Sequence, residues 1–293
     1  MEQLQEYAAT ETAEAVPGIP PPLVIGREPR VPSEPGALPS VQRPDTEIDG
    51  AALPGLVVRA ASVRGDVHRY YGTPRQDAMG LWHDGDRTLL ACVADGLGSK
   101  ELSQLGADTA CRAAHAYLDG LLADDPAEPA RRLVESIARE IREQAERCEA
   151  PPDELSTTFL AAVVQERPET PAHRVVLVRV GDCDAWRLHR GVLVPCFDDD
   201  DKEEEAMVAT SETRALPRHI EHVEVRQLDL HPGDMLLLCT DGLSKPMRGP
   251  QVSTQLAAWW HNGPPSLTEF FWQMSFRAKT HDDDRTAVCI WRV

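Results

Sequence analysis

Leu89-Leu90-Ala91-Cys92-Val93-Ala94-Asp95-Gly96-Leu97-Gly98-Ser99 is the stretch that decides the fold. Its apolar and small residues predict a buried strand that ends abruptly at Asp95. Gly96 and Gly98 allow a sharp turn and let a ligand approach the main chain closely. Taken alone, the stretch also fits a plain strand, turn and helix with a capping aspartate, so a role for Asp95 needs support from the rest of the chain.

The same design occurs twice more along the chain. Residues 234–241 form another apolar run that ends in Asp241-Gly242-Leu243, and Asp282-Asp283-Asp284 leads into a third run at 287–293. Carboxylates from three strand ends cannot share a low-dielectric interior without a positive partner, because unpaired buried charges are too costly. Mg²⁺ and Mn²⁺ suit sites built from carboxylates, carbonyls and water. The three acids therefore predict a divalent-cation site.

A series of short motifs in this order resembles the metal-dependent protein phosphatases, the protein phosphatase 2C family of serine/threonine phosphatases, in its bacterial form. The motifs are Gly72-Thr73-Pro74-Arg75-Gln76-Asp77-Ala78, Ala94-Asp95-Gly96-Leu97-Gly98, Ser156-Thr157-Thr158, Val180-Gly181-Asp182-Cys183, Leu238-Cys239-Thr240-Asp241-Gly242-Leu243 and Asp283-Asp284-Arg285-Thr286. Each motif is weak singly, but their joint order is specific. The resemblance extends over residues 57–293.

The order of the expected elements favours an α+β fold, because runs of strands are broken by pairs of helices. The resemblance implies a four-layer α-β-β-α sandwich, with two central, mostly antiparallel sheets flanked by helices. Residues 1–54 hold ten of the 24 prolines and show no sustained periodicity. We therefore expect a disordered Pro/Glu-rich leader over residues 1–54 and a catalytic domain over residues 55–293.

The charge and the cysteines limit the kinds of partner and compartment. A net charge of −18 disfavours nucleic acid and anionic membrane surfaces as partners. We expect no membrane span and no signal peptide, because no apolar run is long enough and the N-terminus lacks the signal pattern. Seven cysteines without metal-ligand spacing indicate a reducing, cytoplasmic location.

By resemblance, Asp95 bridges two cations, Mn²⁺ or Mg²⁺, and the carbonyl group of Gly96 binds the second. Asp241 and Asp283 complete the shell of the first cation, and Asp77 supports the second through water. Asp95 and Asp241 are thus the expected catalytic residues. The spacing to Thr286 favours Asp283 over its two neighbours.

Two further acids have less defined expected roles. Asp182 is expected to brace the cleft from outside the metal shell. Asp153 lies four residues before Thr157, as does a ligand for a third metal in bacterial relatives, although an ordinary surface aspartate explains it nearly as well.

Two positions depart from the family pattern. Leu97 stands where animal members carry a histidine thought to be a general acid, and Gly72 stands where a phosphate-binding arginine is found. Arg75 is our first choice for the missing cation and His68 the second, and Arg64 and Arg69 stay open.

The sequence predicts a Mn²⁺- or Mg²⁺-dependent enzyme that hydrolyses phosphoserine and phosphothreonine in proteins with a metal-activated water. Its substrates would be targets of a Ser/Thr kinase or the kinase itself, in bacterial signalling. Two alternatives stay open. One is a pseudophosphatase that only binds phosphoproteins, and the other is an enzyme for small phosphorylated metabolites.

Overall fold

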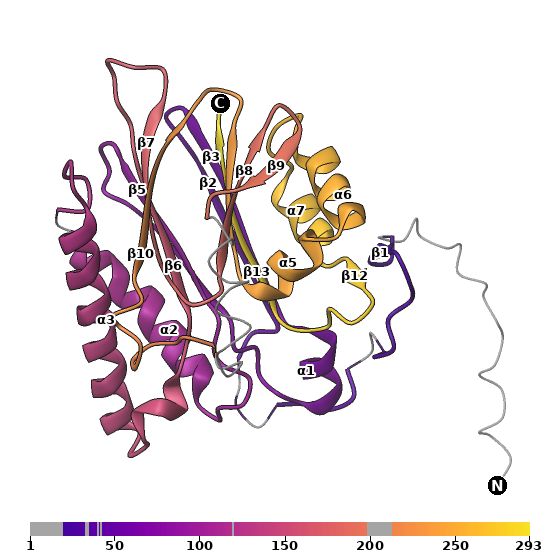
Figure 1. Ribbon diagram of the computed structural model, residues 1–293. Helices are drawn as coiled ribbons and strands as arrows, with labels where there is room; N and C mark the ends of the chain where they lie inside the picture. Colours follow the sequence, from indigo (N-terminus) through magenta and orange to yellow (C-terminus); the bar gives the residue numbers. More distant parts are fainter. Residues whose placement is uncertain (1–19, 33–34, 40, 42, 119, 198–212) are drawn as a thin grey trace, which may run out of the picture.

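Two antiparallel sheets pack face to face at the centre of the molecule, and helices cover both outer faces (Figure 1). The computed structural model describes residues 20–32, 35–39, 41, 43–118, 120–197 and 213–293. The predicted α+β sandwich of four layers is confirmed.

The first sheet contains the strand from which the sequence argument started. Its strand order is β10 (Glu224–Leu230), β7 (His173–Val180), β6 (Phe159–Gln165), β5 (Thr88–Ala94) and β4 (Ala78–His83). Alternate side chains of β5 point to opposite faces. Leu90 and Cys92 pack toward the helices, whereas Ala91 and Val93 pack toward the other sheet. Burial on both faces explains why β5 is apolar throughout.

The second sheet brings the C-terminal acids beside the first sheet. Its order is β2 (Thr46–Leu53), β3 (Leu56–Val63), β13 (Arg285–Arg292), β11 (Met235–Cys239), β8 (Asp184–His189) and β9 (Val192–Pro195). β11 and β13 are antiparallel neighbours, with Cys239 opposite Ala287. The C-terminal end of β11 and the N-terminal end of β13 therefore lie side by side at the same end of this sheet.

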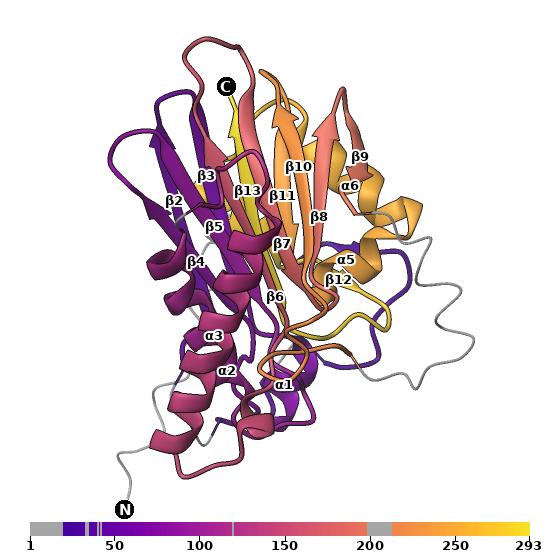
Figure 2. The ribbon, with the colours of Figure 1, turned by 60° about the vertical axis from the view of Figure 1, so that its left-hand side comes forward.

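The helices form the two outer layers. The first sheet is covered by α2 (Ser103–Ala114) and α3 (Ala127–Arg147), which lie in front of it in Figure 2. The second sheet is covered by α5 (Asp241–Met247), α6 (Pro250–Trp260) and α7 (Leu267–Met274). Shorter elements are α1 (Asp66–Tyr71), η1 (His115–Tyr117), η2 (Pro152–Leu155), β1 (Val24–Ile25) and β12 (Arg277–Ala278).

The folded domain begins earlier than residue 55, so the predicted boundary was wrong. β2 (residues 46–53) forms a hairpin with β3, and β1 pairs in parallel with β12. Arg43 adds a contact, because its Nη2 donates to the Asp77 carbonyl oxygen at 2.8 Å. An edge strand that is partly exposed shows little apolar periodicity, which is why the sequence pattern did not reveal β2. Residues 1–19 lie outside the described part of the chain.

The described helices include none that is both long and apolar enough to cross a membrane.

Candidate metal centre

Three carboxylates that follow the ends of separate strands converge at one end of the sandwich. Asp95 follows β5, Asp182 follows β7, and Asp241 follows β11 and begins α5. One carboxylate oxygen from each lies within 4.8 Å of the other two. We call these three residues the acidic trio.

Backbone contacts fix the Asp95 end of the trio. The Asp95 carbonyl oxygen accepts hydrogen bonds from the Thr158 N–H at 2.8 Å and from the Thr157 hydroxyl at 2.9 Å. A Cβ at Gly96 would lie 2.7 Å from the backbone of Ser103, closer than real Cβ atoms approach. Glycine is therefore required after Asp95 for close packing of the backbone.

The Asp241 end is held in the same way. A Cβ at Gly242 would lie 1.9 Å from the carbonyl oxygen of Asp284. The Thr240 N–H donates to the Thr286 carbonyl oxygen at 3.1 Å, and the Thr286 N–H returns a bond of 3.1 Å to the Thr240 hydroxyl. These contacts join the end of β11 to the start of β13, so Asp241 projects from a rigid corner.

The crowded acids perturb one another. Burial, together with the charges of Asp77 and Asp241, raises the pKa of Asp95 well above its usual value. Burial and the charge of Asp284 likewise raise the pKa of Asp77, although the Thr286 and Thr240 hydroxyls donate to its Oδ2 at 2.7 and 2.8 Å. Carboxylates that raise each other's pKa in this way indicate a site that a bound cation would stabilise.

The aspartate run before β13 divides into two roles. Asp284 is buried, and its carboxylate accepts the N–H groups of Gly65 at 2.8 Å and Gln76 at 2.6 Å. Asp283 keeps 58% of its side chain exposed. Asp284 thus braces the backbone, while Asp283 Oδ1 accepts the Asp284 N–H at 2.9 Å. The choice of Asp283 as the cation ligand stays a prediction.

His68 on α1 lies next to Asp283 and Asp284. Its Nδ1 lies 2.8 Å from Asp284 Oδ1, and its Nε2 lies 3.8 Å from Asp283 Oδ1. Burial lowers the pKa of His68, but the hydrogen bond and charge of Asp284 outweigh this effect and raise it. His68 is therefore engaged by carboxylates, so its predicted contact with phosphate stays a prediction.

Arg75 does not face the site, and its predicted role as phosphate ligand was wrong. Its side chain is fully buried, with Nη1 donating to the Ser62 carbonyl oxygen at 2.9 Å and Nη2 lying 2.8 Å from Glu47 Oε2. Glu47 lies on β2, the strand that the sequence argument placed in a leader. Arg75 thus joins β2 to the domain and cannot reach a substrate.

Lys245 supplies a positive charge that the sequence argument did not assign. It lies one turn after Asp241 on α5, its ammonium contacts Asp241 Oδ2, and 57% of its side chain is exposed. Burial lowers the pKa of Lys245, but Asp241, Asp182 and Asp95 raise it overall. The i, i+4 spacing to Asp241 was the signal that could have identified this residue.

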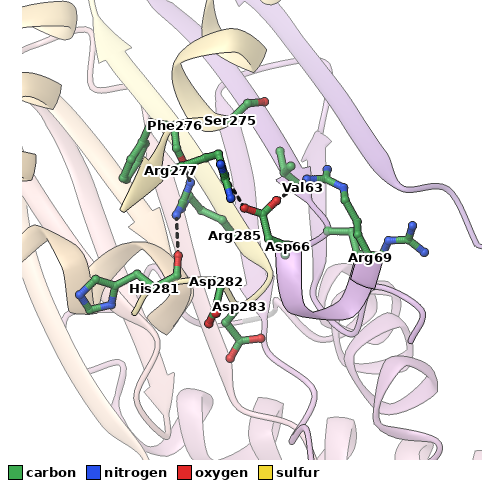
Figure 3. A pocket seen from close by; sticks show the side chains of 12 residues that line it. Val63, Asp66, Arg69, Ser275, Phe276, Arg277, His281, Asp282, Asp283 and Arg285 are labelled. Atoms are coloured by element: carbon green, nitrogen blue, oxygen red, sulfur yellow. Dashed lines mark hydrogen bonds and ion pairs between the residues drawn. The ribbon is translucent and has the colours of Figure 1, made fainter. Parts of the chain in front are cut away.

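Other expected positions fall outside the trio. Asp153 is exposed on η2 and belongs to neither carboxylate group among the described residues, so its role as a third-metal ligand stays a prediction. Asp283 also lines a small cleft of about 30 Å³, between the start of α1 and residues 275–285. Figure 3 shows the side chains that line this cleft. An ion pair of 2.7 Å between Arg277 and Asp66 crosses this cleft. We therefore assign the cleft a structural role.

Asp182 is closer to the site than expected. Its carboxylate belongs to the trio, although the sequence argument placed it outside the metal shell. Gly181 has a φ of +97°, and a Cβ there would lie 2.7 Å from Thr158 Cγ2. The left-handed turn at Gly181 thus leads directly to Asp182, and the Gly-Asp dipeptide after an apolar strand was the available signal.

Comparisons with known proteins agree on one family. The family model described as Protein phosphatase 2C matches residues 64–274. No curated protein sequence matches the chain.

Solved structures show the same fold. PppA, described as a key regulatory component of T6SS in Pseudomonas aeruginosa, is 20% identical with a TM-score of 0.57, and the match covers 81% of this chain and 98% of PppA. The catalytic domain of PstP, solved with two manganese ions, is 22% identical with a TM-score of 0.52, covering 80% and 97%. RsbX, solved with magnesium, is 14% identical with a TM-score of 0.53, covering 83% and 98%.

Proposed function

Because the chain belongs to the protein phosphatase 2C family, we propose that it removes phosphate from phosphoserine and phosphothreonine in proteins at the acidic trio. The family consists of serine/threonine phosphatases, which are hydrolases, so the predicted family and enzyme class are confirmed. The convergence of Asp95, Asp182 and Asp241 within 4.8 Å is the observation that carries the proposal.

The donor set fits hard divalent cations. Asp95, Asp182 and Asp241 offer carboxylate oxygens, and their mutual repulsion favours a positive partner. Asp95, the Gly96 carbonyl, Asp241, Asp182 and Asp283 would hold two Mn²⁺ or Mg²⁺ ions, with Asp95 as the central ligand and Asp77 in a supporting role. When bound, such ions hold the phosphate and lower the pKa of a water so that hydroxide exists near neutrality.

A positively charged side chain beside the acidic trio would orient the phosphate group of the substrate. Lys245 is exposed and lies beside Asp241, so its ammonium is placed to receive a phosphate oxygen. A lysine provides a mobile point charge rather than the paired hydrogen bonds of arginine. We therefore assign phosphate orientation to Lys245 in place of Arg75. The Asp284 carboxylate holds His68 through Nδ1, which leaves His68 Nε2 3.8 Å from Asp283 Oδ1, so His68 would help to position Asp283.

The substrate and the compartment are part of the same proposal. A phosphoprotein made by a Ser/Thr kinase, or the kinase itself, is the substrate class. A reducing cytoplasm is the proposed location, supported by the cysteines, since all seven lie in the described residues and are free thiols.

The test is hydrolysis of p-nitrophenyl phosphate with chelator, with Mg²⁺ and with Mn²⁺, followed by a panel of phosphopeptides and phosphorylated metabolites. We expect turnover only with a metal and a preference for phosphopeptides. Asp95→Asn should be inactive, while Asp86→Asn, an exposed aspartate nine positions earlier, should match the wild type. Metal binding without turnover would instead show a pseudophosphatase, and a preference for metabolites would show the other alternative.

A further inference from the structure

A second group of metal-ligand side chains lies in the loop that precedes β10. His219, Glu221 and His222 each offer one ligand atom, and these atoms lie within 4.8 Å of one another. The group shares no residue with the acidic trio. We call it the histidine cluster.

The distances within the histidine cluster fit a tetrahedral ion better than direct hydrogen bonds. Glu221 Oε1 lies 3.3 Å from His222 Nε2 and 3.5 Å from His219 Nδ1. Charge-assisted hydrogen bonds are shorter, about 2.7–2.9 Å. Ligand atoms about 2.0–2.1 Å from Zn²⁺ in a tetrahedron are separated by about 3.3–3.4 Å. The Glu221–His222 separation therefore matches an edge of a zinc coordination tetrahedron, and the Glu221–His219 separation is slightly longer.

The backbone that carries the cluster is already fixed. Leu216 is fully buried and pairs with Thr157, and the Pro217 carbonyl oxygen accepts a hydrogen bond of 2.7 Å from Arg142 on α3. On the far side of His219, Ile220 and Val223 pack against the core beneath α3. Because the loop is held at both ends, an ion would have to order only three side chains.

The ligand types select the class of metal. Imidazole suits Zn²⁺ and similar transition metals, whereas Mg²⁺ and Mn²⁺ prefer oxygen ligands. The three side chains are partly exposed, which leaves room for a water as fourth ligand. We propose that His219, Glu221 and His222 form a Zn²⁺ site, separate from the acidic trio and different from it in metal preference.

Such a site would act on the loop and on the strand end beside it. Leu216 exchanges backbone hydrogen bonds of 3.0 and 2.8 Å with Thr157, and the Thr157 hydroxyl donates to the Asp95 carbonyl oxygen. An ion on the histidine cluster would hold the segment that leads through Leu216 and Thr157 to Asp95. We therefore assign it a stabilising role.

The test is Zn²⁺ binding by the full chain in saturating Mg²⁺, which fills the oxygen site. Wild-type protein should bind one more equivalent of Zn²⁺ than the double variant His219→Ala/His222→Ala, and Zn²⁺ should raise the melting temperature of the wild type more. His231→Ala, an exposed histidine at the other end of β10, is the matched control and should behave as wild type. Equal stoichiometry and equal thermal shifts in wild type and double variant would overturn the proposal.

A second measurement keeps the proposal testable if the double variant is unstable. Co²⁺ replaces Zn²⁺ in nitrogen and oxygen sites and gives visible absorption whose strength reports tetrahedral geometry. In saturating Mg²⁺, wild type and Glu221→Gln should show this absorption, weaker in Glu221→Gln, and each single histidine variant should lose most of it. Absorption that is the same in all four proteins would place the ion elsewhere.

Discussion

The two ends of β5 carry the same dipeptide, Asp-Gly, in opposite electrostatic settings. At the start of the strand, Asp84 Oδ1 accepts the N–H groups of Asp86, Arg87 and Thr88 at 2.9, 2.9 and 3.0 Å. These hydrogen bonds, of which the one from the Thr88 N–H has the largest effect, lower the pKa of Asp84 to about 2. At the other end, burial and neighbouring acids raise the pKa of Asp95.

The two glycines also serve different purposes. Gly85 has a φ of +83° and open space around it, so it provides the left-handed turn of the β4–β5 hairpin. Gly96 is packed against the backbone of Ser103, so it provides close approach instead. The Asp-Gly with three N–H donors forms a turn, whereas the Asp-Gly crowded by acids lies at the candidate metal centre. The nearby donors, not the dipeptide, distinguish the two.

The largest expected difference between the two ends is in turnover. Asp95→Asn should lower kcat by about a thousandfold or more, because a ligand shared by two metals is worth several kcal/mol in the transition state. Asp84→Asn should leave kcat unchanged. Steady-state rates on an aryl phosphate in Mn²⁺ measure both. Equal losses in the two variants would remove the distinction between the ends of β5.

Stabilisation of the folded protein by metal should depend on the acids near Asp95 and not on Asp84. At a Mn²⁺ concentration one hundred times its Kd, binding to the native state adds about 2.7 kcal/mol to the free energy of unfolding. Denaturant titrations with and without Mn²⁺ should show this gain in wild type and in Asp84→Asn. Asp241→Asn should reduce it, and an undiminished gain in Asp241→Asn would exclude Asp241 as a ligand.

The role assigned to Lys245 predicts a smaller kinetic effect. Lys245→Ala should lower kcat/KM for a phosphopeptide about tenfold, the cost of losing one charge-assisted hydrogen bond. Lys245→Arg should restore most of the loss, because it keeps the charge. Mn²⁺ affinity, measured from the thermal shift, should not fall in Lys245→Ala, since Asp241 loses a competing cation. A fall in Mn²⁺ affinity would show that Lys245 supports the metal ligands instead.

The smallest expected effect is the pH dependence at Asp84. The pKa of Asp84 is lower in the folded than in the unfolded chain, so its stabilising contribution is present above the unfolded value near 4 and is lost as the pH falls through about 2. Asp84→Asn should therefore lower the melting temperature slightly at pH 7. The difference from wild type should shrink in acid, and a constant difference down to pH 2 would show that the charge of Asp84 is unimportant.

The strand ends and most of the acids were predictable because their signals are local. β5 and β11 are apolar runs that stop at Asp95 and Asp241, and the pattern needs no knowledge of the partner strands. The sandwich itself followed from the order of the motifs.

The pairings across the chain were not predictable in this way. Arg75 precedes Asp77 by only two residues, yet Glu47 on β2 and Ser62 on β3 bury its guanidinium. Nothing in the residues around Arg75 indicates these partners. His219 and His222 were missed for a related reason, because their closeness depends on how the loop is anchored at Leu216.

The place of β13 in the middle of its sheet leaves β3 without one of its two partner strands until the end of synthesis. β3 ends at Val63 and its partner β13 begins at Arg285. At a translation rate of ~5–20 residues per second, the ribosome needs roughly 10–45 s to make the intervening chain. During that time the β2–β3 hairpin presents an apolar, unpaired edge, while the first sheet, built from residues 78–230, can already pair. Until residues 285–292 are made, the unpaired side of β3 can pair with strands of other chains.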